Sequence, residues 1–247
     1  IIMDHKARKR FGQNFLIDNH VIDLIVQSIN PTADQSIIEI GPGLGALTLP
    51  LLKKATKLHV IELDRDIIPL LVKTCSGAGE LTIHNVDVLN FDFNELTEDN
   101  KKLRIVGNLP YNISTPILFK LLDYADQIED MFFMLQKEVV NRMAAVPGSG
   151  TYGRLSIMLQ YHCQVSNLFE VPPTAFDPPP KVDSAIVNLR PRAASITVEN
   201  YPLLQQLVRQ AFSMRRKTIR NNLKKLCNDD AFKALDINPS NRPENLY

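Results

Sequence analysis

The tetrapeptide Asn108-Leu-Pro-Tyr111 has residue types that could hold an aromatic amine for alkylation. The lone pair of such an amine is delocalised into its ring, so hydrogen-bond acceptors for both amine hydrogens make the nitrogen more reactive. The side-chain oxygen of Asn108 can accept one bond, and the backbone carbonyl of Pro110, held by the ring's fixed φ, can accept the other. Tyr111 offers a flat face for a base, a contact worth about 1–3 kcal/mol. In an arbitrary loop these residues would more simply form a turn with a capping asparagine.

A glycine-rich turn, Glu39-Ile-Gly-Pro-Gly-Leu-Gly45, stands where a strand passes into a helix. Gly41 and Gly43 allow a tight turn and let a ligand approach the backbone closely. Glu62 and Asp87 follow the next two strands, at the sheet edge where ligands of such folds bind. A nucleoside needs two such acceptors, so we expect Glu62 to bind the ribose hydroxyls and Asp87 the adenine amine.

The same turn leaves an alternative open. With Ala46 it also satisfies the dinucleotide pattern G-x-G-x-x-A, and an acid follows about 20 residues on, where a ribose-binding acid is expected. A nicotinamide-dependent dehydrogenase is therefore conceivable. That function would leave Asn108-Leu-Pro-Tyr111 and the basic C-terminal part of the chain without a purpose.

Strand and helix periods alternate through the first two thirds of the chain, and this alternation must position the polar residues. We expect strands over 36–40, 57–62, 81–84, 103–106 and 131–135, and helices over 21–29, 46–54, 66–74 and 114–124. Such alternation predicts right-handed crossovers and a mainly parallel sheet with helices on both faces. The carboxyl ends of its strands would bring the glycine turn, both acids and the asparagine motif to one edge.

The pattern changes after Pro147. Residues 155–165 and 184–189 predict a late strand pair joined by the proline-rich stretch 171–181. From Tyr201 onward the periodicity is helical. We therefore predict a Rossmann-like α/β domain over residues 1–192 and a small all-α, RNA-binding domain over residues 193–247.

The C-terminal part carries a concentrated positive charge, although the whole chain has a net charge of only +1. Between Asn200 and Asn228 there are seven Lys or Arg residues and no acid. In one helix Arg216, Arg220 and Lys224 would share a face. A stripe of Ile219, Leu223 and Leu226 would dock this helix on its own domain. A solvated basic face is the alternative to phosphate binding.

A second basic cluster near the N-terminus would flank the cofactor pocket. Two such clusters suit contacts to RNA phosphates, which position a nucleic acid without reading its sequence. The residues expected to bind RNA are Lys6, Arg8, Lys9, Arg10, Lys181, Arg215, Arg216, Lys217, Arg220 and Lys224.

Composition excludes several other classes of protein. Cys75, Cys163 and Cys227 lie far apart and form no CxxC pair, which argues against a zinc site and a disulfide framework. The histidines are scattered, so we expect no metal. No stretch has the ~20 apolar residues of a membrane span, and the N-terminus lacks a secretory core. We expect a cytoplasmic protein, monomeric and without a membrane partner.

Seven segments, in their order, resemble the ribosomal RNA adenine N6,N6-dimethyltransferases, specifically those of the bacterial small subunit. They are Arg10-Phe-Gly-Gln-Asn-Phe-Leu16, Glu39–Gly45, Glu62-Leu-Asp64, Asp87, Asn108-Leu-Pro-Tyr-Asn-Ile-Ser114, Phe176-Asp-Pro-Pro-Pro-Lys-Val-Asp-Ser184 and Phe212-Ser-Met-Arg-Arg-Lys-Thr218. The segments are spread along the chain, so the resemblance covers nearly its whole length. The resemblance implies S-adenosylmethionine as methyl donor. The implied substrate is a pair of adjacent adenosines in the 3′-terminal hairpin of 16S rRNA, dimethylated late in small-subunit assembly.

Carried over residue by residue, the resemblance implies that Gln13, Asn14 and Leu16 close over the methionine end of the cofactor. Phe176 would stack on the face of the target base that Tyr111 leaves open. The full expected cofactor-binding set is Gln13, Asn14, Leu16, Gly41, Gly43, Glu62, Leu63, Asp87, Val88 and Asn108, and the expected catalytic set is Asn108, Pro110, Tyr111 and Phe176.

Three related functions compete with this one. A sister group that methylates large-subunit rRNA usually carries Asn-Ile-Pro-Tyr where this chain has Asn108-Leu-Pro-Tyr111. Methylation of DNA adenine uses a similar motif, but the helical C-terminal part looks too small for a domain that reads DNA sequence. An RNA-binding factor on a retired methyltransferase fold would be expected to have lost the cofactor or amine-binding residues, which this chain retains.

Overall fold

The computed structural model describes residues 14–97, 101–194, 196–214 and 216–246. Contacts divide the chain into two compact units. Unit 1 comprises Ile1–Val140 and Ser166–Pro191, and unit 2 comprises Asn141–Val165 and Arg192–Tyr247. The sequence places residues 141–165 in the Rossmann-like part, whereas contacts group them with the C-terminal part. The domain assignment with a boundary between residues 192 and 193 therefore stays a prediction.

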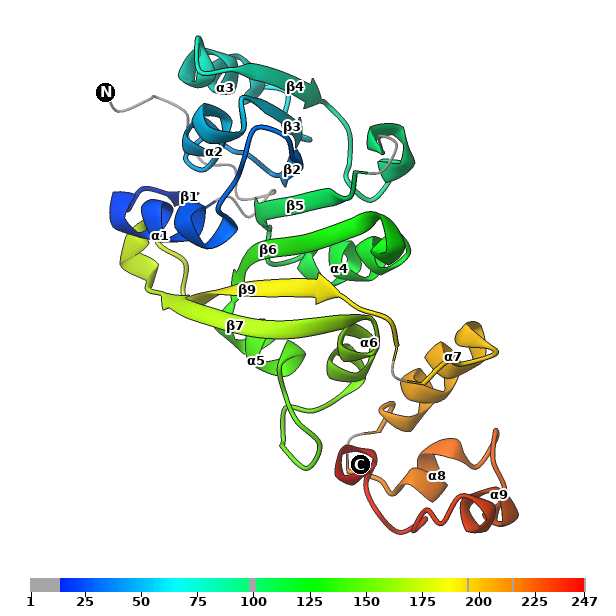
Figure 1. Ribbon diagram of the computed structural model, residues 1–247. Helices are drawn as coiled ribbons and strands as arrows, with labels where there is room; N and C mark the ends of the chain where they lie inside the picture. The colour runs from blue at the N-terminus through cyan, green and yellow to red at the C-terminus, as the bar shows by residue number, and fades with distance from the viewer. Residues whose placement is uncertain (1–13, 98–100, 195, 215, 247) are drawn as a thin grey trace. The chain divides into compact units, whose positions relative to one another are not determined.

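A seven-stranded sheet with the order β4-β3-β2-β5-β6-β9-β7 forms the centre of unit 1 (Figure 1). The first five of these strands run parallel to their neighbours, and β9 runs antiparallel to β6. The strands are β2 (Ser36–Ile40), β3 (Lys57–Ile61), β4 (Glu80–His84), β5 (Leu103–Asn108), β6 (Ile128–Gln136), β7 (Cys163–Val171) and β9 (Ser184–Pro191). The order reverses at β2, which lies between β3 and β5, and such a switch point is where open α/β sheets bind ligands.

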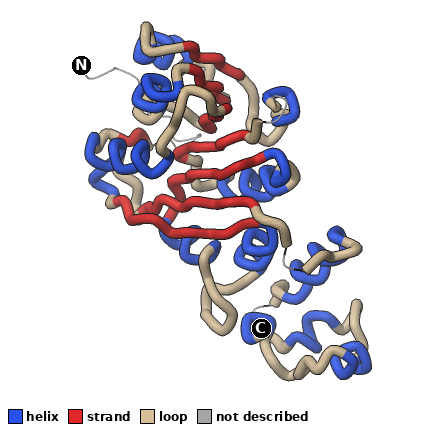
Figure 2. Tube along the Cα trace, in the orientation of Figure 1, coloured by secondary structure: helices blue, strands red, loops and turns tan. Residues whose placement is uncertain are grey.

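Helices cover both sides of this sheet (Figure 2), as the sequence predicts. The helices of unit 1 are α1 (Asn19–Ile29), α2 (Thr48–Ala55), α3 (Ile68–Cys75) and α4 (Ser114–Leu122), with 3-10 turns η2 (Phe93–Leu96), η3 (Ala125–Gln127) and η4 (Pro173–Ala175). Buried residues of α1, α2 and α3 share one core cluster with Ile37, Val60 and Val106 of the strands. Alternation along the strands sends Ile38 and Ile105 to the opposite face. The predicted strands and helices of this part are confirmed within a few residues at their ends.

A short antiparallel pairing joins two segments that lie far apart in the sequence. β1 (Phe15–Leu16) pairs with β8 (Phe176–Asp177), and Leu16 lies opposite Phe176. The backbone N–H of Ile17 also donates to the carbonyl of Ala175, at 2.9 Å. The pairing therefore brings the N-terminal motif against the middle of the proline-rich stretch, which the sequence does not predict.

One predicted strand is wrong in its first part. Residues 155–165 were expected to be extended, but α6 (Arg154–His162) is helical and β7 begins only at Cys163. Leu155, Met158 and Leu159 are buried, and this spacing of three and four residues is helical rather than alternating. The later strand prediction over 184–189 is confirmed by β9, which neighbours β7 in the sheet.

Unit 2 holds the C-terminal helices around a small core of its own. It contains the end of α5 (Lys137–Met143), α6, α7 (Tyr201–Ala211), α8 (Ile219–Leu223), α9 (Asp229–Ala234) and the 3-10 turn η5 (Pro243–Asn245). Ala211, Ile219, Leu223 and Phe232 are buried together. Leu226, the third residue of the predicted stripe, is 40% exposed.

The predicted basic helical face over residues 216–224 is wrong. The side chain of Thr218 accepts a hydrogen bond from the backbone N–H of Asn221, so Thr218 caps α8 and the helix begins only after it. Arg216 precedes this cap, and α8 ends at Leu223. Arg216, Arg220 and Lys224 therefore do not share a face of one helix.

Among the described residues, no helix is both long and apolar enough to cross a bilayer. Cys75, Cys163 and Cys227 are free thiols, the first two buried. Within the described ranges, His, Cys, Asp and Glu side chains form no group of three or more that could hold a metal ion.

Candidate active site

A cavity of about 1100 Å³ opens in unit 1 where the carboxyl ends of β2, β3, β4 and β5 meet. Its walls come from the segments that follow these strands: the glycine turn, the Glu62 loop, the Asp87 loop and the Asn108 motif. The volume exceeds that of most small-molecule sites, which hold about 300–1,000 Å³. It can therefore hold a nucleoside-sized cofactor together with part of a second ligand.

The glycine turn forms the floor between β2 and α2. Gly41 and Gly43 have φ angles of 69° and 55°, a backbone region that side chains disfavour. A Cβ atom on Gly43 would lie 3.3 Å from the ring of Phe15. The turn therefore needs glycine both for its own path and for the close approach of β1.

Glu62 links the glycine turn to the loop that follows β3. It is only 8% exposed, and its Oε1 accepts the backbone N–H of Asp64 at 2.8 Å. Burial raises the pKa of Glu62, although hydrogen bonds from the backbone of Asp64 and Gly43 oppose this rise. The side-chain amide of Asn85 donates to the Glu62 carbonyl at 2.7 Å. The sequence gives Asn85 no role, because its side chain acts on the backbone rather than on a ligand.

Asp87, at the end of the β4 loop, also has a fixed carboxylate. Its Oδ1 accepts the backbone N–H of Leu89 at 2.9 Å, which folds the loop back on itself. Leu63, half exposed, and Val88, buried, also line the cavity beside the two acids. An apolar wall with two carboxylates suits the base and ribose of an adenosine.

Glu39 is a buried acid to which the sequence gives no specific role. It lines the cavity and is 1% exposed. Its Oε2 has no hydrogen-bond partner among the described residues. Burial raises the pKa of Glu39 to about 7. An unsatisfied carboxylate oxygen at a cavity wall is suited to a cationic ligand group, which would remove this cost of burial.

The side chain of Asn108 is oriented by the N-terminal segment. Its Nδ2 donates to the backbone carbonyl of Asn14 at 3.2 Å, which leaves Oδ1 to accept a hydrogen from a ligand. The carbonyl of Pro110 accepts the N–H of Ile113 at 3.2 Å. Because a carbonyl oxygen has two lone pairs, one acceptor position remains at Pro110.

Gly107 lets the Asn108 motif lie close to the glycine turn. The sequence did not predict a role for this glycine. A Cβ atom at Gly107 would collide with the carbonyl oxygen of Ile40. Its absence allows β5 to approach the end of β2, so that a Cβ atom on Gly41 would be 3.7 Å from the carbonyl oxygen of Asn108. In the sequence, the glycine directly before the asparagine was the feature that could have predicted this close approach.

Tyr111 lines the cavity, and its hydroxyl shares a hydrogen bond of 2.6 Å with Oγ of Ser184. Burial raises the pKa of Tyr111, so its phenol stays protonated. Phe176, expected to face the target base, is 2% exposed and packs in the core of unit 1. It is absent from the cavity wall, whereas its neighbour Asp177 is part of it.

Most of the expected cofactor and amine-binding residues thus meet at one cavity. They are Asn14, Leu16, Gly41, Gly43, Glu62, Leu63, Asp87, Val88, Asn108, Pro110 and Tyr111. Gln13 lies outside the described residues. The structure brings together what the sequence predicts at the strand ends, with Phe176 as the exception.

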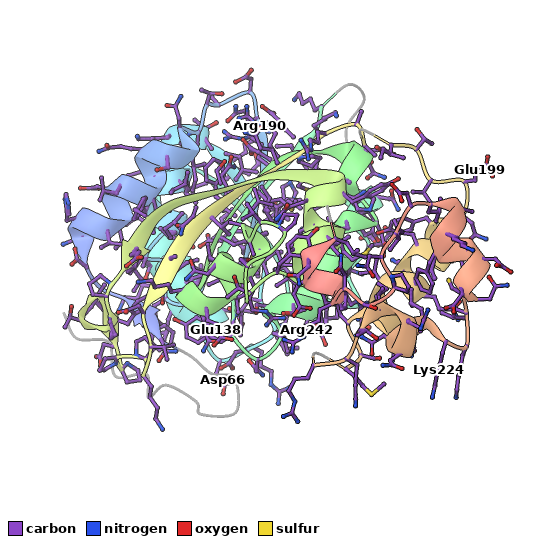
Figure 3. The ribbon with its side chains drawn as sticks, turned by 90° about the horizontal axis from the view of Figure 1, so that it is seen from below. Asp66, Glu138, Arg190, Glu199, Lys224 and Arg242 are labelled. Atoms are coloured by element: carbon purple, nitrogen blue, oxygen red, sulfur yellow. The ribbon has the colours of Figure 1, made fainter. Side chains whose placement is uncertain are left out.

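The expected RNA-binding residues that the structure describes are exposed. Lys181 belongs to unit 1, and Arg216, Lys217, Arg220 and Lys224 belong to unit 2. Figure 3 shows the side chain of Lys224 extending away from the ribbon. Arg220 forms an ion pair of 2.9 Å with Asp229, an acid just beyond the acid-free stretch. The remaining residues, Lys6, Arg8, Lys9, Arg10 and Arg215, lie outside the described ranges.

Comparisons with known proteins decide which family this site belongs to. The model of the family described as ribosomal RNA adenine dimethylase matches residues 4–246. The chain belongs to the ribosomal RNA adenine dimethylase family. It is 54% identical over 245 residues to the ribosomal RNA small subunit methyltransferase A of Vibrio vulnificus (strain YJ016), covering 99% of this chain and 91% of that one. It is 55% identical over 243 residues to the protein of that name from Pseudomonas fluorescens (strain Pf0-1), covering 98% and 89%.

Solved structures of this dimethylase type share the fold. A dimethyladenosine transferase from Plasmodium falciparum is 28% identical, with a TM-score of 0.79 and coverage of 94% of this chain and 92% of that one. The 23S rRNA methyltransferase ErmE is 26% identical, with a TM-score of 0.71 and coverage of 94% and 96%. The chain therefore has the Rossmann-like methyltransferase fold that the sequence predicts.

Proposed function

We propose that this chain dimethylates the N6 amines of two adjacent adenosines in the 3′-terminal hairpin of 16S rRNA, with S-adenosylmethionine as methyl donor. The relatives named above, small-subunit rRNA methyltransferases over nearly their whole length, support the substrate. The observation that carries the chemistry is the position of Asn108, whose free Oδ1 stands at the edge of a nucleoside-sized cavity.

The cavity fits S-adenosylmethionine by its chemistry. Gly41 and Gly43 form a cradle without Cβ atoms, and the two acids Glu62 and Asp87 stand over the next two strands, where they would bind ribose hydroxyls and the adenine amine. Glu39 presents a buried carboxylate oxygen without a partner. The cofactor has a positive sulfonium and a positive ammonium, and a carboxylate oxygen without a partner suits either of these cationic groups. Asn14 and Leu16, together with Gln13, would close over its methionine end.

The residues of this chain would act on the amine rather than on the donor. When bound, S-adenosylmethionine supplies a methyl group already activated on sulfur. Asn108 Oδ1 and the Pro110 carbonyl would each accept one amine hydrogen, which draws the nitrogen lone pair out of conjugation with the purine. Tyr111 would stack on the extruded base, a contact worth about 1–3 kcal/mol, and so offset part of the few kcal/mol that extruding the base costs. Positioning and electrostatics would then supply most of the rate acceleration. The amine proton would leave to water.

Exposed basic residues would hold the RNA by its phosphates. Arg216, Lys217 and Lys224 of unit 2 and Lys181 of unit 1 are exposed cations, and the N-terminal cluster of Lys6, Arg8, Lys9 and Arg10 would add to them. Because phosphate contacts release counterions, the affinity for rRNA should fall steeply with salt. Phe176 would stack on the second face of the base only if the β1–β8 pairing rearranges, since its side chain is buried.

We further propose that the enzyme acts as a monomer in the cytoplasm, on immature small subunits. The glycine turn, both acids and Asn108 line one cavity within a single chain, which supports action as a monomer. The chemistry proposed for Asn108, Pro110 and Tyr111 needs no metal.

Methyl incorporation into defined nucleic acids tests the proposal. The chain is incubated with labelled S-adenosylmethionine and, separately, with unmethylated small subunits, large subunits and duplex DNA, followed by nucleoside mass analysis. We expect N6,N6-dimethyladenosine only in 16S rRNA. Label in large-subunit rRNA or in DNA would show a different substrate, and no label in any of them would contradict methyl transfer.

A further inference from the structure

We propose that Ser184 is a positioning residue for the target base, because its hydroxyl holds the phenol of Tyr111 in the orientation that stacking requires. The inference rests on the function proposed above. It assigns a role to a residue that touches neither the base nor the cofactor: Ser184 is fully buried and is not part of the cavity wall.

The contact itself is short and enclosed. The hydroxyl oxygens of Tyr111 and Ser184 are 2.6 Å apart, near the most frequent distance for hydrogen bonds between hydroxyls. Ser184 is 0% exposed, so water cannot easily reach the serine hydroxyl to replace its partner. A hydrogen bond of this kind is costly to lose, because the remaining hydroxyl would be left buried and unpaired.

Ser184 stands on a rigid element, which makes it a suitable anchor. It is the first residue of β9 and lies opposite Gln136 of β6 in the antiparallel register. The preceding residue, Asp183, accepts the backbone N–H of Lys137 at 2.9 Å. The serine is therefore held on β9 by the pairing of this strand with β6, whereas Tyr111 belongs to the loop that follows β5.

Tyr111 is held at both of its ends. At the backbone, the hydroxyl of Ser114 donates to the Tyr111 carbonyl at 3.1 Å. At the tip of the ring, Ser184 holds the hydroxyl. The side chain between these two points lines the cavity, so the direction in which the ring extends is set before a base arrives. A preset ring avoids part of the cost, about 0.5–1.5 kcal/mol, of immobilising a side chain on binding.

The test compares Ser184→Ala, Tyr111→Phe and the double variant with the unchanged chain. Each substitution removes the same hydrogen bond and keeps the aromatic ring. We expect each variant to lower kcat/KM for unmethylated small subunits roughly threefold to tenfold, with the KM for S-adenosylmethionine unchanged. The double variant should lose no more than either single one. Ser28→Ala is the matched control, because it removes an exposed hydroxyl that donates to the Leu24 carbonyl on α1.

Two outcomes would overturn the inference. One is wild-type kcat/KM in Ser184→Ala. The other is a loss in the double variant that equals the product of the single losses, since this would mean that the two hydroxyls act independently. A merely structural role for Ser184 would also raise the KM for the cofactor, which binds in the same cavity. If Ser184→Ala does not fold, Tyr111→Phe still removes the bond, and normal kcat/KM in that variant would contradict the inference.

A measurement without substrate separates this inference from the proposed function. The chain contains six tyrosines, and with ¹³C at the ring Cζ the Tyr111 signal is the one missing in Tyr111→Phe. Ser184→Ala should shift that signal, because Cζ senses the hydrogen bond of its hydroxyl. An unchanged signal would refute the anchor even in an active enzyme. A shifted signal in a chain that methylates no RNA would instead leave the anchor standing and contradict the proposed function.

Discussion

Asn108 is the side chain on which the proposed chemistry of the site depends most. Its amide nitrogen donates to the carbonyl of Asn14, so its oxygen stays available for the proposed bond to the target amine. Asn14 belongs to the N-terminal motif, and Asn108 ends β5. The acceptor geometry at the amine therefore depends on a contact between residues that are 94 positions apart.

Asn108→Ala should lower kcat at least about a hundredfold, the loss typical when a preorganised hydrogen-bonding partner is removed from a site of charge development. Single-turnover methylation of unmethylated small subunits measures this loss, and calorimetric titration measures cofactor affinity. We expect cofactor binding to remain largely intact, because Gly41, Gly43, Glu62 and Asp87 are unchanged. Near-normal turnover in this variant would refute the proposed amine geometry.

Glu39 links the site to pH through its burial. Its pKa in the folded chain is about 7, raised from 4.5. Between these two values the folded state keeps a proton that the unfolded state has released. The buried Glu39 therefore lowers the free energy of unfolding progressively as pH rises from about 4.5 to 7.

Glu39→Gln should remove this pH dependence and raise the free energy of unfolding at pH 8 by up to about 3 kcal/mol. At pH 4 the gain should vanish. Denaturant titrations at both pH values measure the change, with the exposed Glu129→Gln as control. The same substitution should weaken cofactor binding above pH 7, because it removes a negative charge from the cavity. Parallel stability profiles for the variant and the unchanged chain would contradict the assignment.

At the scale of the elements, a buried ion pair ties β5 to β6 at the end of the sheet away from the cavity. Arg104 Nε and Asp130 Oδ1 are 2.8 Å apart, and both side chains are almost fully buried. Arg104 also donates to Gln35 and to the Ile29 carbonyl, each at 2.7 Å. The guanidinium therefore joins α1, the segment before β2, and two strands.

Asp130→Ala should destabilise the chain by about 3–5 kcal/mol, because it leaves the charge of Arg104 buried without its partner. Thermal and denaturant unfolding measure the loss. The exposed pair Lys57–Glu80 is the control, and Glu80→Ala should change stability little. Well below the melting temperature Asp130→Ala should keep normal kcat, since the pair lies far along β5 and β6 from Asn108. A large fall in kcat without loss of stability would contradict a purely structural role.

At the scale of the whole molecule, the proposed RNA binding would use exposed cations of both units, and these cations are not equivalent. Arg220 is paired with Asp229, so part of its charge is already neutralised. Arg216 and Lys217 lie in the segment between α7 and α8, outside any helix. We expect this segment to contribute more to phosphate binding than α8 does.

Arg216→Glu should therefore weaken binding to small subunits more than Arg220→Glu does, and Asp229→Asn should strengthen it. Binding titrations over a range of salt concentrations measure these effects. Loss of one phosphate contact should reduce the slope of log K against log salt by about one. Cofactor affinity serves as the control for folding and should not change. Equal losses for the two arginine variants would mean that the ion pair does not restrain Arg220.

Local pattern was sufficient for much of this protein, because the period of apolar residues and the position of glycines are local properties. Strand ends at Ile40, Glu62, His84 and Val106 could be predicted, within two residues of those observed, and in a parallel sheet these ends must share one edge. The glycine turn, the two acids and the asparagine motif were therefore predictable as one site.

Tertiary structure alone decided the features that depend on contacts distant in sequence. The burial of Phe176 follows from its pairing with Leu16, the Tyr111 anchor from the approach of β9, and the raised pKa of Glu39 from its burial. The helical start of residues 154–162 and the break before α8 reflect packing and a cap at Thr218, which outweighed the expected strand and the continuous basic helix. Period alone does not specify which neighbour will bury a side chain, since that depends on the three-dimensional path of the whole chain.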